Sequence, residues 1–576
     1  MTETTDDQGI PQPTGHADVI ETEYEIGQDN IESSIGPFGF DIHNPVFLIS
    51  GLAIVAFVLF AFIAPTTTAN FFSGVDASAV EGCEAGAFCD VGLRAYLTSG
   101  FDWFFLSAAN IFVIFCLLLI VTPLGNVRLG GVDAKPDYGY AGWFAMLFAA
   151  GMGIGLMFFG VLEPAYYFGT PWGDEPLGAV RPFTEDGALI PENVAEAKRM
   201  ALAATSYHWA LHPWAIYAVV ALSLALFSYN KGLPLSIRSA FYPILGDRVW
   251  GWWGHIIDVL AVFATLFGLA TSLGIGAQQA NAGLGFVYGV PVNTTVQVIL
   301  ICGITAIALV SVLRGLDGGV KILSEINMVV AVALLLFVVI TAGVVQVFGN
   351  FFTGLLGYFQ EIIPLSNPIG RTDDGYREGW TAFYWAWWIS WSPFVGMFIA
   401  RVSRGRSVRE FVTCVLIIPS LVCVFWMATF GGSAIADMVA SPEASAVKAN
   451  VIDSYKPELS LFAMLQGLPL TAITSTIGIV LVIVFFVTSS DSGSLVIDTI
   501  TAGGKVDAPV PQRVFWCTFE GAVAIALLVG GGLSSLQAMV ISTGLPFTII
   551  LLLMCYAIWK GLASERTTVK EALAAE

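Results

Sequence analysis

The stretch from Trp380 to Phe398, WTAFYWAWWISWSPFVGMF, is the part of the sequence best suited to bind a ligand. It holds five of the chain's 16 tryptophans and no charged residue. In a helix, four aromatic residues at i, i+3, i+4 and i+7 share one face: Tyr384, Trp387, Trp388 and Trp391. Such a face suits a quaternary ammonium group, which ring quadrupoles attract by about 0.5–2 kcal/mol per ring. An interfacial tryptophan belt is the alternative, but this face repeats over two turns.

A second aromatic group lies between Ser206 and Tyr217, in the sequence SYHWALHPWAIY. Trp209, Trp214 and Tyr217 surround Pro213, which predicts a kink in the helix. A kink can turn rings at i, i+5 and i+8 toward one space. Without that kink, aromatic residues at this spacing are typical of a packed core.

Three alternating glycines, Gly151, Gly153 and Gly155, interrupt an apolar stretch. Each lowers helix propensity by roughly 1 kcal/mol, and glycines at i, i+2 and i+4 do not share one helix face. The pattern predicts an unwound segment in the middle of the membrane. Irregular backbone at that depth is tolerated beside a cavity or inside protein. Close packing of helices is the alternative interpretation.

The segment FFVTSSDS at 485–492 ends an apolar stretch with a polar run. The carbonyl of Phe485 and the hydroxyls of Thr488 and Ser489 fall at i, i+3 and i+4. Three oxygens on one face suit a small hard cation. Hydroxyls that bond back to their own helix are the alternative.

The composition predicts an all-α protein that crosses the membrane many times. The chain has 576 residues, of which 56% are hydrophobic and 12% charged, with a mean hydropathy of +0.77. We expect twelve spans, at 44–64, 103–122, 141–168, 203–228, 256–286, 295–312, 327–347, 380–400, 411–436, 471–497, 514–532 and 538–559.

Charge sets the expected orientation. Sixteen of the 24 Lys and Arg residues fall on one side of these spans, including a cluster of four arginines in 401–410, which predicts that this side is cytoplasmic. Both termini are then cytoplasmic. Residues 1–43 hold ten acidic residues and no Lys or Arg, so we expect a disordered tail and no secretory signal. Residues 560–576 form a second, short tail.

The loop cysteines and the histidines have separate interpretations. Cys83 and Cys89 fall in a loop that this topology places outside the cell, where a disulfide can form. His208 and His212 stand at i and i+4 without a third metal ligand nearby. We therefore interpret the two histidines as packing residues.

The sequence resembles the betaine/carnitine/choline transporter (BCCT) family from about residue 44 to residue 559. Five motifs carry the resemblance: AAGMGIGLMF at 149–158, HWALHPWAIY at 208–217, ATLFG at 264–268, YWAWWISWSPFVGMF at 384–398 and FFVTSSDS at 485–492. The resemblance implies a transporter rather than an enzyme. It also implies a LeuT-like core of two inverted five-helix repeats, spans 3–7 and 8–12, with spans 1 and 2 peripheral.

The resemblance also implies particular binding residues. The substrate is expected to contact aromatic and glycine residues, namely a cage of Trp209, Trp214, Tyr217 and Trp388, the pathway residues Trp387 and Trp391, and Gly151, Gly153 and Gly155. A sodium ion is expected at the carbonyls of Ala149, Met152 and Phe485 and the hydroxyls of Thr488 and Ser489. A second sodium site maps to Thr265 and Phe394, but it is weakened because Leu269 stands where the family can carry a second threonine.

Together with the aromatic face, the resemblance implies an importer of a zwitterionic quaternary-ammonium solute, with glycine betaine first. We expect sodium symport for osmoprotection across a bacterial inner membrane, with no cofactor and no nucleic-acid partner. The amphipathic segment 350–363 resembles the family's trimer-forming helix, so we expect a homotrimer. The alternative substrates are ectoine, proline, carnitine and dimethylsulfoniopropionate, or choline coupled to protons. A non-transporting sensor or a channel is the alternative from another class.

Overall fold

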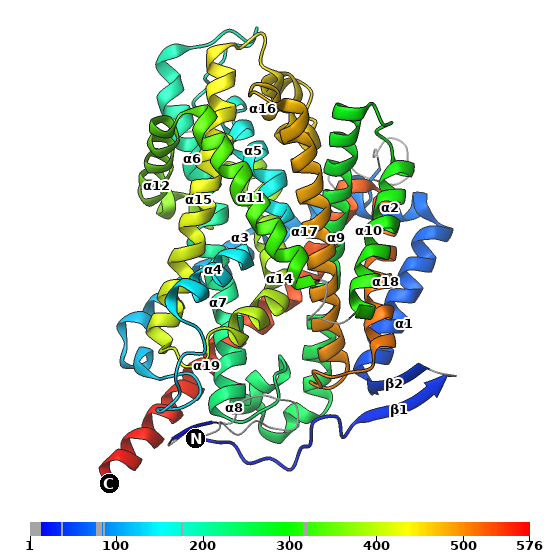
Figure 1. The fold of residues 1–576 in the computed structure, drawn as a ribbon, viewed down its shortest axis with the longest axis vertical. Helices are drawn as coiled ribbons and strands as arrows, with labels where there is room; N and C mark the ends of the chain where they lie inside the picture. Colours follow the sequence, from blue (N-terminus) through cyan, green and yellow to red (C-terminus); the bar gives the residue numbers. More distant parts are fainter. Residues whose placement is uncertain are drawn as a thin grey trace.

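The computed structural model describes residues 13–15, 17–35, 38–75, 83, 87–151, 153–173, 177–314 and 320–575. It is a bundle of helices with one small β-hairpin at the end where the chain termini lie (Figure 1). The helices of the first half are α1 (Val46–Ile63), α2 (Pro65–Ser73), α3 (Phe88–Val121), α4 (Tyr140–Gly151), α5 (Ile154–Gly169), α6 (Val194–Trp209), α7 (Leu211–Ala225), α8 (Tyr242–Leu245), α9 (Trp252–Tyr288) and α10 (Thr294–Arg314).

The second half continues the bundle. Its helices are α11 (Val320–Ala342), α12 (Val344–Ser366), α13 (Asp374–Tyr376), α14 (Ala382–Arg401), α15 (Val408–Ala440), α16 (Ser460–Gln466), α17 (Thr471–Thr501), α18 (Val510–Val529) and α19 (Gly532–Ala575). Short 3-10 and π turns connect several of them, among them the π turn η7 (Arg377–Thr381), which leads into α14.

The expected class, an all-α membrane protein, is confirmed. In the described part of the chain, ten helices are long and apolar enough to cross a membrane. The predicted spans 141–168 and 380–400 are not among these ten. The first is divided into α4 and α5, and in the second the polar atoms of Trp, Tyr and Ser in α14 lower the hydropathy. The count of twelve and the inverted repeats therefore stay predictions.

The predicted break at the alternating glycines is confirmed. Helix α4 ends at Gly151 and α5 begins at Ile154, with Gly153 in extended backbone at φ −169° and ψ −173°. Met152 lies outside the described residues. The amide groups at the start of α5 have no carbonyl one turn earlier to bond within a helix.

The kink expected at Pro213 occurs three residues earlier. Helix α6 ends at Trp209, Ala210 leaves the helical region with φ −100° and ψ −124°, and α7 starts at Leu211. Proline has no N–H to bond the carbonyl four residues before it, which here is the carbonyl of Trp209. The ladder is therefore broken where the aromatic residues lie.

The aromatic helix α14 lies near the centre of the bundle (Figure 1). It packs against α7, α9 and α19, and α17 packs along α9. Nearly all of its side chains are buried. Because α14, α7 and the start of α5 converge, the aromatic and glycine motifs come close together in space.

The acidic N-terminal segment is ordered in its described part, so the expected disorder is wrong there. Strands β1 (Asn30–Ile35) and β2 (Phe38–His43) form an antiparallel hairpin. Asp18 pairs with Lys231 at 2.6 Å, and Asp41 with Lys505 at 2.5 Å. Fixed lysine partners neutralise the acidic groups, and a composition argument cannot foresee them.

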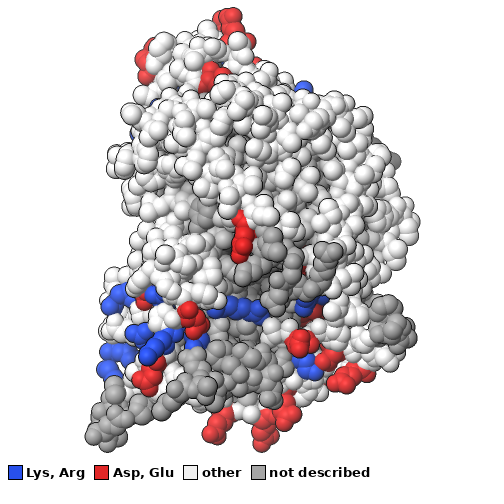
Figure 2. All heavy atoms as spheres, in the orientation of Figure 1, with Lys and Arg blue, Asp and Glu red and all other residues white. Residues whose placement is uncertain are grey.

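Three further features concern the chain ends and the surface. Helix α19 continues to Ala575, through the expected tail. A disulfide joins Cys83 to Cys89, as the sequence predicts. On the face in Figure 2, Lys and Arg gather at the end where both termini lie, and few charged side chains appear in the middle.

Candidate functional site

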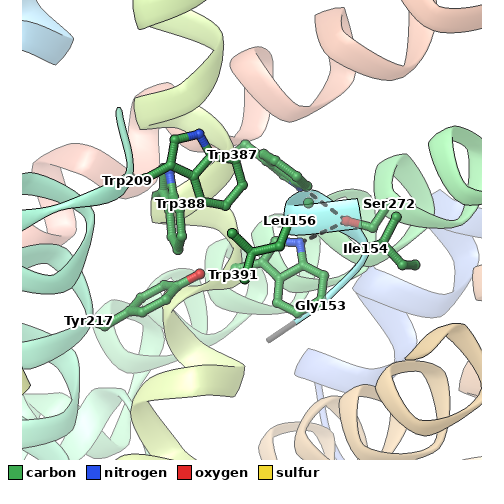
Figure 3. A pocket seen from close by; sticks show the side chains of 10 residues that line it. Gly153, Ile154, Leu156, Trp209, Tyr217, Ser272, Trp387, Trp388 and Trp391 are labelled. Carbon is green, nitrogen blue, oxygen red and sulfur yellow. Dashed lines mark hydrogen bonds between the residues drawn. The ribbon is translucent and has the colours of Figure 1, made fainter. Parts of the chain in front are cut away.

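An aromatic cavity lies beside the break between α4 and α5. Its empty volume is about 450 Å³. Figure 3 shows five aromatic side chains around a common space, with the hydroxyl of Tyr217 directed toward it. The described residues that line the cavity are all uncharged: Gly153, Ile154, Gly155, Leu156, Trp209, Tyr217, Ser272, Trp387, Trp388 and Trp391.

Trp388 is at the centre of the aromatic group. Its ring lies 5.3 Å from that of Trp209 and 5.1 Å from that of Tyr217, at interplanar angles of 80° and 63°. The rings therefore meet at steep angles and offer faces and edges in several directions. Such a box matches the requirement of a bulky cation that binds through ring faces.

Trp214 is the one expected cage residue that does not line this cavity. It is fully buried behind the cage, with its ring 5.5 Å from Tyr217 and 6.1 Å from Trp388. Trp214 and Tyr217 stand at i and i+3 of the continuous helix α7, so they share one face of it. Trp214 thus packs directly on two rings of the cage.

Ser272 of α9 fixes two of the tryptophans, and the sequence analysis missed it. Its hydroxyl oxygen accepts hydrogen bonds from the indole nitrogens of Trp387 and Trp391, both at 3.1 Å (Figure 3). The hydroxyl itself donates to the carbonyl of Gly268 at 3.1 Å. One serine therefore orients two rings of the cavity wall.

Gly155 is required by the closeness of the tryptophans. A Cβ atom at this position would come within 2.8 Å of Trp209 Cη2 and 2.9 Å of Trp387 Cη2. A Cβ at Gly153 would meet no atom within 4 Å. Steric space thus explains glycine at 155, whereas glycine at 153 belongs to the backbone break.

A second cavity lies next to the first and holds the expected sodium ligands. Its empty volume is about 790 Å³. Ala149 of α4 and Phe485, Thr488 and Ser489 of α17 all line it, while Met152 lies outside the described residues. The Thr488 hydroxyl is 3.1 Å from the carbonyls of Val484 and Phe485, so in this structure it bonds back to its own helix.

Trp391 connects the two cavities because it lines both. The expected second sodium site involves Phe394 of α14 and Thr265 of α9. Phe394 lines the second cavity, but the buried Thr265 donates its hydroxyl to the carbonyl of Ala261 at 2.7 Å, within α9. The second sodium site stays a prediction.

A model of the BCCT family, the betaine/carnitine/choline family transporters, matches residues 45–567. The chain belongs to the BCCT family. It is therefore a membrane transporter and not an enzyme. The match covers every helix that builds the two cavities.

Several members of the BCCT family are similar over most of the chain. A glycine betaine/proline/choline transporter of Vibrio parahaemolyticus is 57% identical over 564 residues, 98% of each chain. Glycine betaine transporter 1 of the same bacterium is 56% identical, covering 95% of this chain and 98% of its own. The glycine betaine transporter OpuD of Bacillus subtilis is 42% identical, covering 83% of this chain and 90% of its own.

Proposed function

We propose that this BCCT protein imports a zwitterionic quaternary-ammonium solute, with glycine betaine first, by coupling its uptake to sodium. The aromatic cavity carries the proposal. Its described lining includes four tryptophans and one tyrosine and no charged side chain. A trimethylammonium group cannot donate hydrogen bonds, so ring faces offer it more than carboxylates or carbonyls alone.

The carboxylate of the solute also has a partner in this arrangement. Helix α5 starts at Ile154, and Gly153, Ile154 and Gly155 line the cavity. Free amide groups at a helix start attract anions. A zwitterion can place its ammonium group among the rings and its carboxylate at this helix start.

Sodium is proposed to bind in the second cavity, at Ala149, Phe485, Thr488 and Ser489, with Met152 as the fifth ligand. An ion there contacts both α4 and α17. Helix α4 ends at the break beside the proposed solute site. Trp391 borders both cavities. The coupling of ion and solute therefore requires no long-range path.

The cellular setting follows from charge and surface. We propose that both termini are cytoplasmic, in the inner membrane of a bacterium, because the basic side chains gather at their end (Figure 2). The exposed apolar side chains of Phe352, Leu356, Phe359 and Ile363 on α12 support a homotrimer. Uptake of a compatible solute serves osmoprotection.

The test of this proposal must also distinguish glycine betaine from other solutes. The names of relatives include proline, choline and ectoine besides glycine betaine. Choline lacks the carboxylate, and proline lacks the quaternary group, so each removes one half of the proposed recognition. A channel or a sensor would bind the solute without accumulating it.

The test is uptake into proteoliposomes under an imposed sodium gradient, with a panel of glycine betaine, choline, proline, ectoine, carnitine and dimethylsulfoniopropionate. We expect accumulation of glycine betaine against its gradient. We also expect the other quaternary zwitterions of the panel to compete with its uptake more strongly than the remaining solutes do. Equal uptake with and without the sodium gradient would contradict the proposed coupling. Binding without accumulation would favour a sensor.

A further inference from the structure

Glu163 is a carboxyl group that neither the expected site nor the proposed transport cycle uses. It lies in the second half of α5, beyond the residues that line the cavity, and is completely buried. A buried carboxyl group in a membrane protein is costly unless partners surround it. Its partners therefore indicate what it does.

Two of its hydrogen-bond partners, Trp209 and Tyr384, belong to the aromatic group around the cavity. The Trp209 indole N–H donates to Glu163 Oε2 at 2.8 Å, and the Tyr384 hydroxyl donates to the same oxygen at 2.6 Å. These lengths are in the range of charge-assisted hydrogen bonds. A single carboxyl oxygen thus connects α5 to both α6 and α14.

His208 completes the group on the other oxygen. Its Nδ1 lies 2.6 Å from Glu163 Oε1, and its Nε2 lies 2.9 Å from the Thr381 hydroxyl oxygen. That hydroxyl lies 3.3 Å from the carbonyl of Tyr376, to which it can donate. His208 therefore links Glu163 of α5 to Thr381 of the π turn η7. Both carboxyl oxygens of Glu163 therefore have hydrogen-bond partners.

The Trp209 ring is held at two opposite edges. Glu163 binds its N–H edge, and Gly155 lies against the other edge, where a Cβ would come within 2.8 Å. The plane of the ring relative to Trp388 depends on both contacts.

We infer that Glu163 is a positioning residue for the aromatic cage. It holds Trp209 and Tyr384 through one oxygen, so binding of a quaternary ammonium solute depends on a carboxylate that does not line the cavity. The inference rests on the proposed function. The inference adds Glu163 to the residues on which solute binding depends, although Glu163 lies 221 positions before Tyr384 in the sequence.

Glu163→Gln separates charge from packing. The glutamine oxygen can still accept from Trp209 and Tyr384, and its amide can donate to His208, so a role in packing alone predicts unchanged affinity. We expect the variant to bind glycine betaine roughly tenfold more weakly, with a higher KM and little change in the maximal uptake rate. Calorimetry and uptake in proteoliposomes measure these quantities.

A double-mutant cycle tests the link to the ring. Trp209→Phe keeps a ring and removes the N–H, so adding Glu163→Gln should weaken binding further by less than about threefold. Trp214→Phe is the matched control, because Trp214 packs on the cage but does not donate to Glu163. There the full tenfold loss is expected. Equal losses in both backgrounds, or wild-type affinity of Glu163→Gln, would overturn the inference.

The outcomes also separate the inference from the proposed function. If the wild type binds none of the solutes in the panel, the proposed function fails. If it binds glycine betaine and Glu163→Gln binds it equally well, only the role of Glu163 fails. Should Glu163→Gln elute as an aggregate in size-exclusion chromatography, Tyr384→Phe replaces it. Removing that one donor should raise KM, and an unchanged KM would overturn the inference.

Discussion

Replacing Trp388 by leucine should weaken the binding of glycine betaine about five- to thirtyfold. Leucine keeps apolar bulk and removes the π face that meets both Trp209 and Tyr217, at 5.3 and 5.1 Å between ring centres. One cation–π contact in a desolvated site is worth roughly 1–2 kcal/mol, and each 1.4 kcal/mol corresponds to about tenfold in affinity. Trp388→Phe keeps a smaller π face and should lose less.

The assay is calorimetry on purified protein at saturating sodium. Trp252→Phe serves as the control, because Trp252 is an exposed residue at the start of α9 and should leave affinity unchanged. Size-exclusion chromatography shows whether the smaller side chain has destabilised the protein, since emptying a buried site costs stability. Wild-type affinity in a well-folded Trp388→Leu variant would refute a cage at this position.

Three other predictions concern neighbouring parts of the site. Gly155→Asp should abolish sodium-driven betaine uptake or change the coupling ion, because its Cβ collides with Trp209 and Trp387 and its carboxylate adds a fixed charge. Uptake of betaine and choline with and without sodium decides this, and wild-type transport would contradict it. Thr488→Ala combined with Ser489→Ala should raise the sodium concentration for half-maximal uptake about tenfold or more, with little effect on solute binding without sodium; an unchanged sodium titration would remove the ion from this position. Ser272→Ala should raise KM about three- to tenfold, because the indole N–H of Trp387 loses its acceptor and that of Trp391 keeps only the Gly268 carbonyl. Ser272→Thr, which keeps the hydroxyl, should restore most of the loss.

The local parts of the site are visible in the sequence because they depend on short-range spacing. The alternating glycines predict the break between α4 and α5, and in the structure α4 ends at Gly151 and α5 begins at Ile154. The helical spacing of Trp387, Trp388 and Trp391 places them on one cavity wall. In each case the signal lies within a few residues of the feature.

The supporting contacts are not visible because they join distant positions. Ser272 bonds Trp387 from 115 positions away, and Glu163 bonds Trp209 from 46. The presence of Glu163 in the apolar stretch VLEPAYYF was a usable signal, since a carboxyl group there needs partners. His208, interpreted as a packing residue, is one of those partners.

Two features of the structure depend on tertiary partners. Trp214 has the spacing of a cage residue and packs on Tyr217 and Trp388, although it does not line the cavity. The acidic composition of residues 1–43 predicts disorder, but Lys231 and Lys505 supply partners for its carboxylates. Neither composition nor local spacing reveals which distant residues will be in contact in the fold.

The most direct test of the proposed sodium coupling is the affinity for glycine betaine measured by calorimetry at zero and at saturating sodium. Two ligands that stabilise the same arrangement raise each other's affinity by the same factor, typically about five- to 150-fold. We therefore expect sodium to tighten betaine binding within this range, and betaine to tighten sodium binding equally. An affinity for glycine betaine that is the same with and without sodium would show that the two cavities are not coupled.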